Sequence, residues 1–213
     1  MEGRSILIVF FVDTYKRLTN IMRCNTVPRL NQESVATHSY FVVVLSMLVA
    51  DFFVSKGEKI DKQKICELAM VHDWEECFSG DITAAIKYHE KEFAQQLELV
   101  NIRAIEYVTK SLKLLQPYWV RVWHEARKKE SIESKIVAGC DYICSAVWAL
   151  IELEMGNKNV LHIFENGIKT AIERCPMLEP IAMELVARSG IAISFDSPAF
   201  HGEKIEDTAK YND

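Results

Sequence analysis

An adjacent His-Asp pair, His72-Asp73, follows an apolar stretch with helical periodicity. Two more polar residues stand in apolar surroundings: His38 within a helix-forming run, and Asp141 within the segment IVAGCDYICSAVW. A buried carboxylate that lacks a partner is costly, and a cation is one way to satisfy it. Imidazole and carboxylate together suit Mn²⁺, Fe²⁺, Co²⁺ or Zn²⁺. The pattern therefore indicates a metal site, although each residue taken alone is also compatible with an ordinary hydrogen-bonded group.

Two carboxylates follow the His-Asp pair closely. Glu76 is four residues after His72 and three after Asp73, so a continuous helix would place all three on one face. There Glu76 could hydrogen-bond a metal-bound water or a leaving oxygen. Asp81 follows a Ser-Gly turn and could point back into the same pocket, or cap a short helix over 82–88, and the two roles are compatible. Four protein ligands would leave an open coordination position, which is typical of a catalytic metal.

The spacing of these residues resembles that of a known family. The string from Arg23 to Glu33-Ser-Val-Ala-Thr-His38, then His72-Asp73-x-x-Glu76-x-x-x-Gly80-Asp81, then Asp141, is similar to the HD-domain 5'-deoxynucleotidases over about residues 10–155. Phage deoxyadenosine triphosphohydrolases (dATPases) share the pattern. The resemblance implies one divalent ion, Mn, Co, Mg, Fe or Zn, and places it on the ligands His38, His72, Asp73 and Asp141. It also implies that Glu76 and Asp81 are the acid/base and water-positioning carboxylates.

The same resemblance implies substrate contacts. Arg23 and Lys87 correspond to positions that bind the phosphate. Cys24 stands where relatives often carry a Trp beside the sugar, and a small thiol cannot exclude a 2'-hydroxyl as a Trp would. Thr26 and Ala85 fall where base-facing residues would lie, and both are small. The resemblance therefore leaves open the base and the strictness of deoxyribose selection.

The resulting expectation is a hydrolase acting on phosphoric ester bonds. It would attack the α-phosphate of deoxyadenosine nucleotides, dAMP or dATP, and release the deoxynucleoside with phosphate or triphosphate. Two alternatives remain open. The chain could be a nucleotide-binding sensor or interaction module without turnover, or an HD-type phosphodiesterase, although the second His cluster that those enzymes usually carry is not visible here.

The elements that must position these residues are expected to be helices, since the 213 residues include only 8 Gly and 5 Pro and show long apolar periodicities. The prediction is an all-α fold: a single HD-domain helical bundle over 1–190 and a polar tail over 191–213, partly ordered or at an oligomer interface. The apolar faces suggest a homo-oligomer. The predicted helices cover residues 5–22, 34–53, 62–77 (capped by Asp61), 82–88, 90–115, 117–129, 131–155, 160–173 and 176–187.

Charge and cysteine content indicate which partners and which compartment to expect. A net charge of −5 does not favour binding to a nucleic-acid polymer or a membrane surface, so the expected partner is a small nucleotide. The apolar run Ile6–Val12 is too short to span a bilayer. The six cysteines form no CxxC pair and lie mostly in apolar segments, which predicts reduced thiols and a cytoplasmic protein.

Overall fold

The computed structural model of the chain describes residues 6–83 and 91–195, and within them every regular element is helical. The all-α prediction is therefore confirmed. An isolated antiparallel bridge between Met22 and Ser34 closes the loop that joins the first two helices. The elements are α1 (Ile6–Leu18), α2 (Val35–Ser55), α3 (Lys62–Val71), α4 (Glu76–Ser79), α6 (Lys91–Thr109), a 3₁₀ segment (Lys110–Leu115), α7 (Gln116–Lys128), α8 (Ile132–Glu154), a 3₁₀ turn (Lys158–Val160), α9 (Leu161–Arg174), a 3₁₀ turn (Pro176–Leu178) and α10 (Glu179–Ser189).

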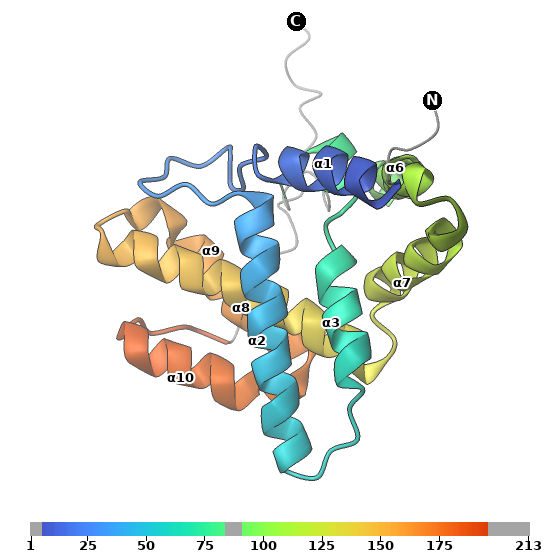
Figure 1. The fold of residues 1–213 in the computed structure, drawn as a ribbon. Coiled ribbons are helices and arrows are strands. Elements are labelled where there is room, and N and C mark those ends of the chain that lie inside the picture. The colour runs from blue at the N-terminus through green and yellow to red at the C-terminus, as the bar shows by residue number, and fades with distance from the viewer. Residues whose placement is uncertain (1–5, 84–90, 196–213) are drawn as a thin grey trace, which may run out of the picture.

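Helices α2 and α8 cross at the centre of the bundle (Figure 1). Each begins at a serine cap: the hydroxyl of Ser34 accepts the N–H of Thr37, and that of Ser131 accepts the N–H of Ser134. Helix α8 contacts α2, α3, α7 and α9, and its buried face contributes to two hydrophobic clusters. The two central helices therefore provide a rigid frame for side chains that project between them.

Both central helices are long and apolar enough to cross a membrane when judged by length and composition alone. Their packing gives another explanation for that composition. The apolar part of α8 is 67% buried within the bundle, and α2 packs against α3 and α8 through one face. A helix in the core of a soluble protein is apolar around most of its circumference, as α8 is.

Helices α8 and α9 approach closely because each carries a glycine at the contact. A Cβ on Gly167 in α9 would lie 2.9 Å from the carbonyl oxygen of Tyr142 in α8, and one on Gly139 in α8 would lie 3.3 Å from the carbonyl oxygen of Ala171 in α9. These positions have no room for a side chain. Helix α8 thus packs against α9 as well as against α2.

The predicted helix 62–77 is wrong beyond Val71. Asp61 caps it as expected, but α3 ends at Val71 and α4 begins only at Glu76. The imidazole Nδ1 of His72 lies 2.8 Å from the carbonyl oxygen of Ala69, which a continuing helix would use to accept the N–H of residue 73. A turn therefore follows, and the expectation that Glu76 shares a helix face with the His-Asp pair fails.

Other boundaries also differ from the predictions. The first helix ends at Leu18, because the chain beyond it turns to form the Met22–Ser34 bridge. The predicted helix 90–115 divides into α6 and a 3₁₀ segment with a kink at Lys113, whose φ is +52°. Most of the predicted helix 82–88 lies outside the described residues.

Candidate metal centre

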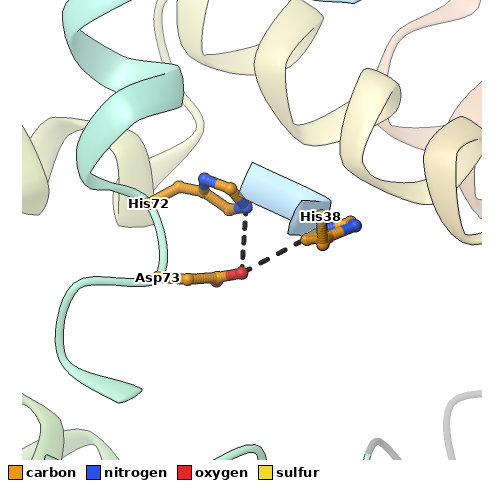
Figure 2. Close-up of side chains that lie close together, drawn as sticks. All are labelled: His38, His72 and Asp73. Atoms are coloured by element: carbon orange, nitrogen blue, oxygen red, sulfur yellow. Dashed lines mark ion pairs between the residues drawn. The ribbon is translucent and has the colours of Figure 1, made fainter. Parts of the chain in front are cut away.

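His38, His72 and Asp73 meet at one point of the bundle. One ligand atom from each lies within 4.8 Å of the other two. Figure 2 shows both imidazoles directed toward the carboxylate of Asp73, with Nε2 of His72 at 3.0 Å and Nε2 of His38 at 4.0 Å from Oδ2. His38 comes from the second turn of α2, and the other two residues come from the turn that follows α3.

Asp141 adjoins this group from α8. Its Oδ1 lies 2.9 Å from Nε2 of His38, the nitrogen that also faces Asp73. The structure thus brings together the four residues that the sequence pattern suggested as ligands, although Asp141 contacts the cluster only through His38 among the contacts observed. The two carboxylates are 20% and 30% exposed, while the His38 side chain is fully buried. The centre is therefore open to solvent on its carboxylate side.

The donor atoms fit a divalent cation. Nδ1 of His72 donates to Ala69, which leaves Nε2 as the ligating nitrogen, and this buried Nε2 has no hydrogen bond of acceptable geometry despite its 3.0 Å approach to Asp73. Two ligands at about 2.1 Å from a metal and at right angles lie about 3 Å apart. The His72–Asp73 and His38–Asp141 separations, 3.0 and 2.9 Å, agree with that spacing.

Burial and charge set the protonation of the cluster. Burial, reinforced by the Arg23 guanidinium, lowers the pKa of His38 to about 4. Burial also disfavours the charged form of His72, but the attraction of the Asp73 carboxylate is the larger effect and raises the pKa of His72 to about 9. Burial would raise the pKa values of both carboxylates, yet the charge of His72 lowers that of Asp73 and the His38 hydrogen bond lowers that of Asp141 to about 2. The cluster thus holds two anionic carboxylates, and His72 carries one positive charge. A divalent cation could take the place of that charge, because His72 would release a proton when the cation binds.

Arg23 lies beside the centre, in the loop between α1 and α2. Its guanidinium contacts Nδ1 of His38, lies 3.4 Å from Oε2 of Glu33 and donates to Oγ of Ser145 at 3.1 Å. Burial would lower the pKa of Arg23, but the surrounding carboxylates, Asp141 foremost, raise it above its usual range. Arg23 is therefore a permanently cationic group at the edge of the cluster and not a solvated surface residue.

The carboxylates expected to take part in catalysis lie in the next segment. Glu76 is the first residue of α4 and is only 6% exposed. Asp81 is partly buried, and its Oδ2 accepts the backbone N–H of Cys24 at 3.1 Å. This bond joins the segment after α4 to the loop that carries Arg23.

The structure describes two of the four other residues that are expected to contact the substrate. Cys24 is partly buried, packs against the cluster around α8 and α9, and has a φ of +52°. Thr26 is exposed in the turn that follows. Lys87 and Ala85 lie outside the described residues.

Several residues around the centre have contacts that the sequence did not reveal. Glu33 and Ser145 hold Arg23, and neither stands out by residue type. Glu75, next to Glu76, is 3% exposed and accepts the indole N–H of Trp123 at 2.7 Å. Glu75 thus attaches the start of α4 to α7. The sequence does contain a signal for Glu152, a fully buried carboxylate in α8, because this residue stands in an apolar segment as Asp141 does.

Comparison with known proteins identifies the family of this chain. A family model described as 5'-deoxynucleotidase YfbR-like matches residues 10–184. A 5'-deoxynucleotidase of Bos taurus is 30% identical over 158 residues, 72% of this chain and 72% of that protein. An HD-domain phosphohydrolase from Listeria innocua has the same fold, with a TM-score of 0.74 at 24% identity over 85% of this chain and 90% of its own.

A phage enzyme also shares the fold. The HD phosphohydrolase of cyanophage S-2L, whose structure contains dA and one catalytic Zn²⁺, superimposes with a TM-score of 0.57 at 19% identity, covering 83% of this chain and 95% of its own. At this identity the likeness shows the fold alone. The family match, by contrast, covers most of the chain and includes every residue of the candidate centre. The chain therefore belongs to the YfbR-like 5'-deoxynucleotidase family and is a hydrolase.

Proposed function

We propose that this enzyme uses one divalent ion, held by His38, His72, Asp73 and Asp141, to hydrolyse the 5'-phosphate ester of deoxynucleotides by attack at the α-phosphorus. The observation that carries the proposal is the convergence of two imidazoles and two carboxylates from α2, the turn after α3, and α8. Mn²⁺, Co²⁺, Fe²⁺ and Zn²⁺ all suit this donor set, and Mg²⁺ belongs in the same trial.

A divalent ion at this centre supplies Lewis acidity toward water and a phosphate oxygen. The protein supplies the remaining chemistry. Arg23, already cationic and adjacent to the cluster, binds the phosphate and stabilises its negative charge. As the water oxygen bonds to phosphorus, Glu76 takes the water proton, and as the bond to O5' breaks Glu76 returns that proton to O5'. Asp81, fixed by the Cys24 N–H, orients the water.

Deoxyadenosine nucleotides are the substrates we propose. The phage structure of the same fold contains dA, and the family is named for 5'-deoxynucleotidase activity. Cys24 leaves space near the sugar that a larger residue would fill. AMP therefore belongs in the same test as the deoxynucleotides.

Product analysis by chromatography with dAMP, dATP, dGMP and AMP, in Mn²⁺ or Co²⁺, tests the proposal. Phosphate and deoxyadenosine from dAMP, or triphosphate and deoxyadenosine from dATP, are the expected products. A melting-temperature shift with nucleotide but no product with any metal would instead favour a sensor. Hydrolysis of a cyclic dinucleotide alone would favour a phosphodiesterase.

We also propose that two copies associate through an apolar stripe on α2, which we define as Tyr40, Phe41, Val44, Leu48 and Phe52. These side chains are 39–64% exposed and recur at helical spacing on the face opposite the bundle core. A half-exposed large side chain presents on the order of 100 Å², so the five together present about 500 Å², which is the larger part of the roughly 800 Å² per partner of a standard interface. A second copy fits because one self-complementary stripe then covers another. A cytoplasmic location agrees with the free cysteines.

The double substitution Leu48→Glu with Phe52→Glu is expected to give a monomer, because it places charges at the centre of the stripe. Light scattering after size exclusion should report a mass near 24.4 kDa for the variant and twice that for the unsubstituted protein. Glu58→Lys, an exposed charge change just beyond α2, serves as the control and should leave the dimer intact. A monomeric unsubstituted protein would contradict the proposed interface.

A further inference from the structure

Glu152, near the C-terminal end of α8, is a fully buried carboxylate far from the metal centre. It accepts the backbone N–H of Leu30 at 2.8 Å, a close N–H from Asn31, and the side-chain amide of Asn157 at 2.6 Å. Burial would raise the pKa of Glu152, but the hydrogen bonds from Asn157, Leu30 and Asn31 lower it. A charged group is thus kept inside the protein by bonds to a loop 121 and 122 residues away in sequence.

Asn157 extends this attachment. Its amide also donates to the carbonyl of Pro28 at 2.8 Å, so three positions of the loop, 28, 30 and 31, are held through side chains at and just beyond the end of α8. The same loop carries Arg23 at its base, where the N–H of Arg23 bonds to the carbonyl of Glu33 at 2.9 Å. The tip of the loop is therefore fixed to α8, while its base lies at the candidate metal centre.

A chain of contacts leads from the held tip to the catalytic segment. Arg29, between the held positions, donates from Nη1 to the carbonyl of Cys24 at 2.9 Å. Cys24 in turn donates its N–H to Oδ2 of Asp81 at 3.1 Å. Cys24 has a φ of +52°, a conformation that costs free energy for a residue other than glycine and persists only where its surroundings enforce it.

From these contacts we infer that Glu152, with Asn157, is a positioning site: it holds the loop 23–31 in the shape that presents Arg23 to the nucleotide and the Cys24 N–H to Asp81. Glu152 does not touch the proposed substrate and acts through the loop backbone. A carboxylate is needed there because its two oxygens together accept four hydrogen bonds and every partner is a donor: the Leu30 N–H approaches both oxygens, at 2.8 and 3.1 Å, and Asn31 and Asn157 donate one bond each. A glutamine would turn an N–H₂ group toward one of these donors. The inference rests on the proposed nucleotide hydrolysis.

Glu152→Gln tests the inference in the full-length protein, with Glu154→Gln, an exposed glutamate on the same helix, as the matched control. Loss of a hydrogen bond to a charged acceptor changes an equilibrium by about tenfold or more. Amide hydrogen exchange at Leu30 and Asn31, and trypsin cleavage after Arg29, should therefore increase at least about tenfold in Glu152→Gln and remain unchanged in Glu154→Gln.

Kinetics supply the readout that a purely structural role would not give. For dAMP, KM should rise about tenfold in Glu152→Gln while kcat changes less than about threefold and the Mn²⁺ affinity, measured by calorimetry, stays unchanged. Unchanged loop exchange would overturn the inference, as would a looser loop with an unaltered KM. An equal loss of metal affinity and helicity would also overturn it, because the site would then support the whole fold.

The two proposals fail in distinguishable ways. If the unsubstituted protein neither binds nor hydrolyses any nucleotide, the proposed function is wrong, and with it the positioning role. The exchange and cleavage measurements would still show whether Glu152 holds the loop. If the unsubstituted protein is active but the two glutamate variants behave alike, only the positioning role fails.

Discussion

Asp73→Ala is expected to abolish nucleotide hydrolysis, with a loss of well over about a hundredfold, since substitution of outer partners of a metal ligand already costs 10- to 100-fold. Oδ2 of Asp73 lies within 4.0 Å of Nε2 of both imidazoles, and its removal leaves the buried Nε2 of His72 without its close anionic neighbour. Phosphate release from dAMP measures the loss, and calorimetry with Mn²⁺ should show greatly weakened binding. Circular dichroism should show the helical content retained, because Asp73 lies in a turn.

Asp51→Ala is the matched control for this experiment. Asp51 is an exposed aspartate on α2 whose observed partner is Lys62, and an exposed ion pair contributes little to stability. The control should bind Mn²⁺ and hydrolyse dAMP as the unsubstituted protein does. Turnover by metal-stripped Asp73→Ala at the rate of the unsubstituted protein would disprove the proposed metal centre.

Glu76→Gln is expected to lower kcat by about 10²- to 10⁴-fold, the range for loss of a general acid or base, because the amide cannot take up the water proton. The substitution preserves size at a position that is only 6% exposed, so folding should be little affected. Mn²⁺ binding should also persist, because the four proposed ligands are intact. Single-turnover measurements with dAMP separate the chemical step from binding.

The neighbouring glutamate, Glu75, provides a matched control for the substitution of Glu76. Glu75 is also buried, but its carboxylate accepts the indole N–H of Trp123 and lies 3.7 Å from Arg127. Glu75→Gln keeps an acceptor for the indole N–H and should retain kcat within a few-fold. If Glu75→Gln and Glu76→Gln lost activity equally, the loss would come from disturbance of α4, and the proton-transfer role of Glu76 would be refuted.

Much of the helical framework could be predicted because its signals are local. Helix caps depend on a side chain and an N–H three residues later, and the predicted starts at Ser34, Asp61 and Ser131 all show that bond. Apolar periodicity likewise predicted the two long helices, 34–53 and 131–155, that form α2 and α8. The end of α3 could not be read in this way, because it depends on the orientation of one imidazole, His72, toward the Ala69 carbonyl.

The sequence by itself determined the chemical types at the centre, because a histidine or aspartate in an apolar segment needs a partner whatever the fold. Only the tertiary structure decided which partners meet: His38 and Asp141 are 103 residues apart in sequence, and Glu152 and Leu30 are 122 apart. Such contacts depend on how α2 and α8 cross, and that crossing depends on close packing along both helices and on glycines such as Gly167 where α9 approaches. The spacing of motifs along the chain does not predict that packing. The attachment of the loop to α8 could therefore be found only from the tertiary structure.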